Sequence, residues 1–161
     1  MHSTVYELSD HPIPKAKQIT PGYLPDWFFW SICNYATTMA DSERKESIQR
    51  LSKHLGNLCV CNGEQLTFSP NLKQMYFLES HHYFQVAALA LAKADYESFA
   101  GIKPAPALGL ALNGILESYE DKNGYYIYSH KNGELMSLDH WLRVTDLSKS
   151  FYVGGTIEYY Y

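Results

Sequence analysis

The sequence predicts an α+β fold: a single domain over residues 1–161, with helices packed on a small, mostly antiparallel sheet. Helical and strand patterns interleave without the regular alternation of a doubly wound parallel sheet. The 161 residues are 46% apolar and 19% charged, a balance that is typical of a globular domain with one core. Two turn signals separate short runs of strand-forming residues, so β-hairpins are expected near 58–68 and within 124–160.

The amino-terminal elements are predicted to be a strand and an aromatic helix. Val5-Tyr6-Glu7-Leu8 predicts a short strand, which ends before Pro12-Ile13-Pro14 because proline lacks the N–H donor of a ladder. Residues 26–39 begin with Trp27-Phe28-Phe29-Trp30 and carry large apolar side chains on every side. Because a surface helix keeps such side chains to one stripe, a buried helix is expected here.

The clearest helix should run from the region of Asp41 to Leu55. Asp41 or Ser42 can cap its first N–H groups, and Gly56 can adopt the backbone conformation that ends many helices. Its apolar side chains recur at helical spacing, at positions Ile48, Leu51 and Leu55.

A β-hairpin and two further helices follow in the predicted order. Asn62-Gly63 suits a type I′ turn between the flanking strand-forming runs. Ser69-Pro70 then begins a long helix with a period near 3.6, which should reach about Phe99 with a kink near Ser80. After two prolines, residues 108–119 predict another helix.

From Gly124 the pattern becomes mainly β. Strands are expected at 125–128 and 134–136 on either side of a turn at 131–133, and Ser137 should cap a short helix over 138–143. The last β segment covers 151–160. Within it, Gly154-Gly155 should form either a two-residue turn or a β-bulge.

Composition narrows the classes of function. No stretch has the roughly 20 apolar residues of a membrane-spanning helix, and the first residues lack a secretion signal, so a cytoplasmic protein without membrane contact is expected. A net charge of -4 argues against a partner held by phosphate neutralisation, so direct nucleic-acid binding is not favoured. The three cysteines are expected to be reduced thiols, and the pattern leaves the oligomeric state open.

Thiol and imidazole groups form the one candidate metal site. Zinc prefers such ligands, but Cys59-x-Cys61 puts both sulfurs on one strand face, whereas zinc ribbons place their cysteines on a turn. Buried cysteines and no cofactor are therefore expected. A small metal protein or enzyme remains an open alternative; its candidate residues are His54, Cys59, Cys61 and His82, with His81 adjacent.

Catalytic motifs are weak in this sequence. No Gly-x-Ser-x-Gly elbow surrounds a serine, and Asp139-His140 has no identifiable nucleophile beside it. Cys33 lies in the most apolar segment, where burial raises the pKa of a thiol and suppresses its reactive form. The sequence therefore predicts a protein that is not an enzyme.

Tyrosines and acids concentrate towards the carboxyl end and predict a docking surface. Tyrosine offers a large contact area with a polar tip, and interspersed carboxylates can complement a basic partner. An alternative is a module that binds RNA or single strands by stacking bases on Tyr126, Tyr128 and Tyr152. The residues expected to bind a protein partner are Tyr125, Glu134, Asp139, Glu158 and Tyr160.

Several segments resemble small proteins carried by phages and mobile elements of Gram-positive bacteria, a loose group that includes antirestriction and anti-CRISPR inhibitors. The segments are Val5–Ser9 with Pro12-Ile13-Pro14, Tyr126-Ile127-Tyr128, Gly133–Asp139 and Gly154–Tyr159. The resemblance contains no catalytic or ligand motif, so it carries over no residue roles. It implies an inhibitor that binds a host nuclease or its nucleoprotein complex. Because -4 is mild for a full DNA mimic, blocking an interface or locking a conformation is favoured.

Overall fold

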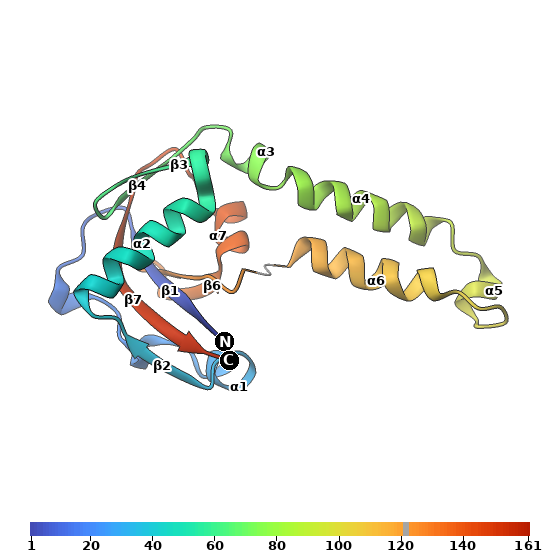
Figure 1. Cartoon of the computed structure of the whole chain (residues 1–161), viewed down its shortest axis with the longest axis horizontal. Coiled ribbons are helices and arrows are strands. Elements are labelled where there is room, and N and C mark those ends of the chain that lie inside the picture. Colours follow the sequence, from blue (N-terminus) through green and yellow to red (C-terminus); the bar gives the residue numbers. More distant parts are fainter. Residues whose placement is uncertain (121–122) are drawn as a thin grey trace. The chain divides into compact units, whose positions relative to one another are not determined.

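The computed structural model describes residues 1–120 and 123–161 (Figure 1). The α+β class is confirmed, with 47% helix and 24% strand. The chain divides into two compact units. The sheet unit comprises residues 1–73 and 123–161, and the helix unit comprises the described residues of 74–122. That residues 1–161 behave as one domain stays a prediction.

The sheet unit is built on a mixed sheet in which β7 and β1 are central. The order is β3-β4-β7-β1-β5-β6, and β2 also pairs with β7. Among the strand pairs of the described residues, only β1 and β5 run parallel and the others are antiparallel. Both expected β-hairpins form, as β3-β4 and β5-β6. The strands are β1 His2–Ser9, β2 Tyr35–Thr38, β3 Cys59–Asn62, β4 Gln65–Phe68, β5 Tyr126–Ser129, β6 Glu134–Ser137 and β7 Phe151–Tyr160.

Two helices of the sheet unit agree closely with the sequence. Helix α2, Asp41–Leu55, ends at Gly56, whose φ of 60° suits glycine. Its cap differs from expectation, because the residue before the helix is Ala40, whose N–H donates to the Glu43 side chain at 2.9 Å. Helix α7, Leu138–Val144, has the expected cap, in which the Ser137 side chain accepts from the His140 N–H. Short 3-10 turns lie at Lys15–Lys17, Pro21–Tyr23 and Gly56–Leu58.

The prediction of one buried helix over 26–39 is wrong. Helix α1 covers only Asp26–Ser31, and Tyr35–Thr38 forms β2 against the end of β7. The Tyr-Ala-Thr-Thr run includes residues that favour strands, and pairing with β7 outweighs the local helical pattern. Of the four aromatic residues of α1, only Phe28 is buried.

The single long helix expected from Ser69-Pro70 to Phe99 is also wrong. The region forms α3, Leu72–Tyr76, α4, Leu78–Ala92, and α5, Tyr96–Phe99. The first break lies at Phe77 rather than near Ser80. The second arises because the Asp95 side chain accepts from the Ser98 N–H at 2.8 Å and so starts a new helix. Helix α6, Pro106–Tyr119, confirms the prediction for 108–119 and begins at the proline.

Gly154-Gly155 forms a bulge, the second of the two expected possibilities. Tyr6 pairs with Thr156 and Leu8 with Val153, so Glu7 of β1 faces both glycines of β7. Glu7 is fully buried, and its Oε2 accepts from the Gly155 N–H at 2.7 Å and the Ile19 N–H at 3.0 Å. Arg44 of α2 donates to the Gly154 carbonyl at 2.7 Å. A Cβ on Gly154 would collide with the Glu7 carboxylate, which explains the glycine.

Candidate functional site

Large aromatic side chains are exposed where α1, β2 and the end of β7 meet. Figure 1 places α1 beside both chain termini, and the Met1 amino group donates to the Tyr161 carbonyl at 3.0 Å. We call this surface the aromatic end. Its exposed rings are Trp27, Phe29, Trp30, Tyr35, Tyr160 and Tyr161.

The core fixes the orientation of these rings. Phe28 points inward, with its ring 5.0 Å from those of Tyr126 and Tyr159 in edge-on contacts. Since Phe28 takes the inward position of a six-residue helix, the neighbouring rings of α1 remain on the outside. The segment after α1 is tied to β7 because the Asn34 N–H donates to the Tyr160 carbonyl at 2.7 Å.

The three consecutive tyrosines follow the alternation of a strand at its end. Tyr159 is buried and donates its hydroxyl to the Gly124 carbonyl at 2.5 Å. Tyr160 is exposed on the other side, 6.0 Å from the ring of Tyr35 on the neighbouring strand. Tyr161 is exposed near the Tyr159 ring, at 5.6 Å. Two of the last three tyrosines are therefore exposed and one is buried.

The electrostatics of the aromatic end are acidic. The segments 18–43 and 150–161 contain no lysine or arginine, whereas they include Asp26 and Glu158. Glu158 is partly buried and accepts from the Tyr160 hydroxyl at 2.8 Å, and its other oxygen lies 3.7 Å from the His2 ring. The hydrogen bond with this carboxylate raises the pKa of Tyr160 above its usual range. The surface thus combines aromatic rings with the carboxylates of Asp26 and Glu158, near the His2 ring and the Met1 amino group.

The five residues predicted to bind a partner do not form one surface. Glu158 and Tyr160 lie together at the aromatic end. Asp139 is only 7% exposed, so its carboxylate is not open to a docking partner. Tyr125 is partly buried, with its ring 5.9 Å from that of Tyr6, and Glu134 is exposed on β6. Of the five predicted residues, the structure therefore brings together only Glu158 and Tyr160, both on β7.

The other candidate residues mainly serve the interior. Tyr128 is buried and Tyr126 packs against the core, so these two rings are not open to stacking by bases; Tyr152 is partly buried. Burial raises the pKa of the Cys59 thiol to about 11 and also raises that of Cys33. Across residues 1–120 and 123–161, no three His, Cys, Asp or Glu side chains are grouped to hold a metal ion. His54 packs on the Tyr125 ring at 5.3 Å, whereas His81 and His82 belong to the helix unit.

Two polar features of the sheet unit were not predicted as sites. Glu7 Oε1 lies 2.8 Å from His130 Nδ1, but the other oxygen of the same buried carboxylate serves the bulge, which indicates a structural role. A cleft of about 360 Å³ is lined by charges of both signs, among them Lys131, Glu134 and Lys149. Its lining also includes apolar side chains such as Leu8, Trp141 and Phe151, so it is a mixed polar and apolar hollow.

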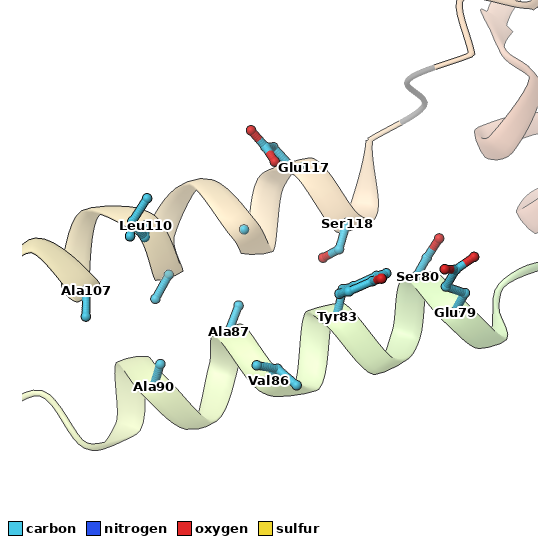
Figure 2. Close-up of a pocket in the computed structure, with 12 residues that line it drawn as sticks. Glu79, Ser80, Tyr83, Val86, Ala87, Ala90, Ala107, Leu110, Glu117 and Ser118 are labelled. Carbon is cyan, nitrogen blue, oxygen red and sulfur yellow. The ribbon is translucent and has the colours of Figure 1, made fainter.

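The helix unit carries a second unusual surface. A groove of about 700 Å³ lies between α4 and α6 (Figure 2), with an apolar lining that includes Val86, Ala87 and Leu110. No helix in the described parts of the chain is long and apolar enough to cross a membrane.

Comparison with protein-family models, with curated proteins and with solved structures finds no match to this chain.

Proposed function

We propose that this chain is a non-enzymatic protein-binding module that docks its aromatic end on a basic, arginine-bearing protein surface. The observation that carries the proposal is Trp30, which is 83% exposed and shares the six-residue helix α1 with the exposed Trp27 and Phe29. A tryptophan is rarely left in water, because it contributes more apolar area than almost any other side chain. Tryptophan, tyrosine and arginine are also the residues that dominate the binding energy of protein interfaces.

Local charge defines the chemistry of the partner. Asp26 begins α1 next to the exposed Trp27, and Glu158 accepts from the hydroxyl of the exposed Tyr160; both lie in segments without lysine or arginine. A guanidinium can stack on an indole or phenol ring and also bind a carboxylate with two hydrogen bonds. An arginine-bearing surface therefore complements both features of the aromatic end.

Basic, arginine-bearing surfaces are common on proteins that bind nucleic acids. The resemblance to phage and mobile-element inhibitors points in the same direction, towards a host nuclease or its nucleoprotein complex. The chain would occupy part of a nucleic-acid groove or hold one conformation of the enzyme, because its net charge of -4 is too low to replace a whole duplex.

The first test identifies the partner by photo-crosslinking in bacterial cells. A benzophenone amino acid replaces Trp30, and in a matched control it replaces Val60, which is also exposed, at 68%, on β3 of the same unit. Since β3 and β4 pair at the opposite end of β7, the control samples a different surface. We expect a single protein with a basic surface to be captured from position 30 only.

Affinity measurements with that purified partner complete the test. Trp30→Ala should weaken binding by about 30-fold or more, as expected for a central aromatic contact. Glu158→Lys should weaken it by about tenfold and reduce its salt dependence, while Val60→Ala should have no effect. Equal capture from both positions, capture of nucleic acid alone, or unchanged affinity in the Trp30 and Glu158 variants would each contradict the proposal.

A further inference from the structure

Helices α4 and α6 contact each other through small side chains. In Figure 2, Ala87 and Ala90 of α4 and Ala107 of α6 point into the space between the two helices. Gly114 allows close approach, because a Cβ added there would lie 3.4 Å from that of Ala87. Small residues at such positions let two helix backbones come near each other. The only buried residues of the two helices are Ala87 and Ala111, so their contact buries no large apolar side chain.

The large apolar side chains of the same helices face outward. Val86 is 54% exposed and Leu110 is 73% exposed, although both are aliphatic. Charge is nearly absent, since Glu79 is the only acidic or basic residue of α4 and Glu117 the only one of α6, with histidine taken as neutral. Val86 and Leu110 border the groove between α4 and α6, and an exposed apolar surface of this kind usually marks an interaction site. The other exposed apolar side chains of the two helices are Leu78, Tyr83, Phe84, Leu89, Leu112, Leu116 and Tyr119.

The dimensions and charges of the helix pair argue against a lipid bilayer as the occupant. The 15 residues of α4 extend over about 22 Å, whereas the hydrocarbon core of a bilayer is about 30 Å thick. The connection between α4 and α6 carries Lys93, Asp95, Glu97 and Lys103, and two ion pairs join Lys103 to the acids. Inserting these charges into lipid would be costly.

We propose that the outer face of α4 and α6 is covered by the same face of a second copy of the chain, packed antiparallel to form a four-helix bundle. Glu79 and Val86 of α4 and Lys93, which caps its end, are seven residues apart and therefore lie on one side of the helix axis. A two-fold axis beside Val86 therefore sets Glu79 of each copy against Lys93 of the other. The charges on this side of α4 in one copy are therefore complementary to those on the same side of α4 in the other copy.

The ends of the helix pair favour this orientation over a parallel one. Glu117 of α6 is seven residues from Leu110, and it lies at the carboxyl end of α6 as Glu79 lies at the amino end of α4. These two ends are adjacent, because α4 and α6 are neighbouring antiparallel helices (Figure 2). Parallel packing would place acids against acids, and juxtaposed like charges oppose association. Four helices can also enclose a core that two helices cannot.

Sedimentation equilibrium of the purified full chain tests the proposal. The expected mass is that of a dimer, twice 18.4 kDa. Val86→Glu should raise the dimer Kd by about 100-fold or more, because it buries a charge at the centre of the interface. Val60→Glu, which adds the same charge at an exposed position of the sheet unit, should leave it unchanged. Circular dichroism confirms that the helical content of each variant is retained.

A charge exchange tests the orientation. Glu79→Lys and Lys93→Glu should each raise the dimer Kd by about tenfold at low salt, and the double variant should return to within about threefold of the original value. A monomer at all concentrations, no effect of Val86→Glu, or no recovery in the double variant would overturn the proposal. So would binding to phosphatidylglycerol vesicles in place of dimerisation. Trp30→Ala should leave the dimer intact, so this proposal and the proposed function fail separately.

Discussion

The sheet unit and the helix unit distribute their apolar side chains in opposite ways. In the sheet unit, large rings such as Phe28, Tyr6 and Tyr159 are buried around the central strands, and exposed aromatics gather at the aromatic end. In α4 and α6, alanines are buried and large aliphatic side chains face outward. A seam of alanine and glycine permits close helix contact but removes little apolar area from water. The sheet unit thus buries its large apolar side chains within itself, whereas the helix unit leaves most of its own exposed.

The tryptophans allow the two units to be followed separately. All three, Trp27, Trp30 and Trp141, belong to the sheet unit, so their fluorescence reports only its unfolding. Amide hydrogen exchange reports the helices of the other unit residue by residue.

The largest predicted effect is the loss of the central ring of the sheet unit. Phe28→Ala should lower the free energy of unfolding by about 4 kcal/mol, because it leaves a cavity against Tyr126 and Tyr159. Urea unfolding followed by tryptophan fluorescence measures the loss. The matched control is Phe29→Ala on the same helix, which should cost less than about 1 kcal/mol since Phe29 is exposed. Equal losses in the two variants would contradict the inward orientation of Phe28.

A second prediction concerns alkaline pH and the buried phenol of Tyr6. Burial raises the pKa of Tyr6 to about 12, from an ordinary value of 10.0. Between pH 10 and 12 the unfolded chain loses this proton while the folded chain keeps it. The stability that is present below pH 10 should therefore fall through this window, by about 2–3 kcal/mol.

The control for this pH dependence is Tyr6→Phe, which removes the titrating group. It also removes the hydrogen bond from the Tyr6 hydroxyl to the Ser47 carbonyl at 2.9 Å, so about 1 kcal/mol is lost at neutral pH. Burial also raises the pKa of Cys59 to about 11, so its titration lowers the free energy of unfolding from about pH 9 upward. This second loss of stability remains in the Tyr6→Phe variant. Tryptophan fluorescence in urea should thus show a shallower decline for Tyr6→Phe above pH 10. An unchanged slope would contradict the prediction.

Elements with local signals were predictable from the sequence. Helix α2 ends at Gly56, β3 and β4 flank Asn62-Gly63, and α7 follows its Ser137 cap. Each of these signals acts within a few residues, so the distant parts of the chain are not needed to interpret it.

Elements that depend on distant partners were not predictable. Tyr35–Thr38 becomes a strand only because the end of β7 lies beside it, more than a hundred residues later. The same applies to Glu7, whose buried carboxylate is satisfied by Gly155 and Ile19. For the candidate site, Glu158 and Tyr160 were predicted from the tyrosine-rich pattern and lie at the aromatic end, whereas Trp27 and Trp30 were assigned to the interior but are exposed. Composition alone does not distinguish a buried aromatic run from one with a single inward ring.

The smallest predicted effect is a gain of stability in the helix unit. Gly109 lies within α6, and a Cβ added there would meet no atom within 4 Å. Gly109→Ala should therefore stabilise α6 by about 0.5–1 kcal/mol, because alanine loses less backbone entropy than glycine. Amide exchange in α6 should slow by about two- to fivefold.

Gly114→Ala is the matched control on the same helix. Its added methyl would lie 3.4 Å from Ala87 Cβ, so the seam between α4 and α6 must accommodate it and the gain should be smaller. A larger gain at Gly114 than at Gly109 would mean that the seam is loosely packed, and the contrast with the closely packed sheet unit would then be greater. Faster exchange in both variants would mean that α6 is not helical at these positions. The difference in amide exchange between Gly109→Ala and Gly114→Ala therefore shows how tightly the small side chains between α4 and α6 are packed.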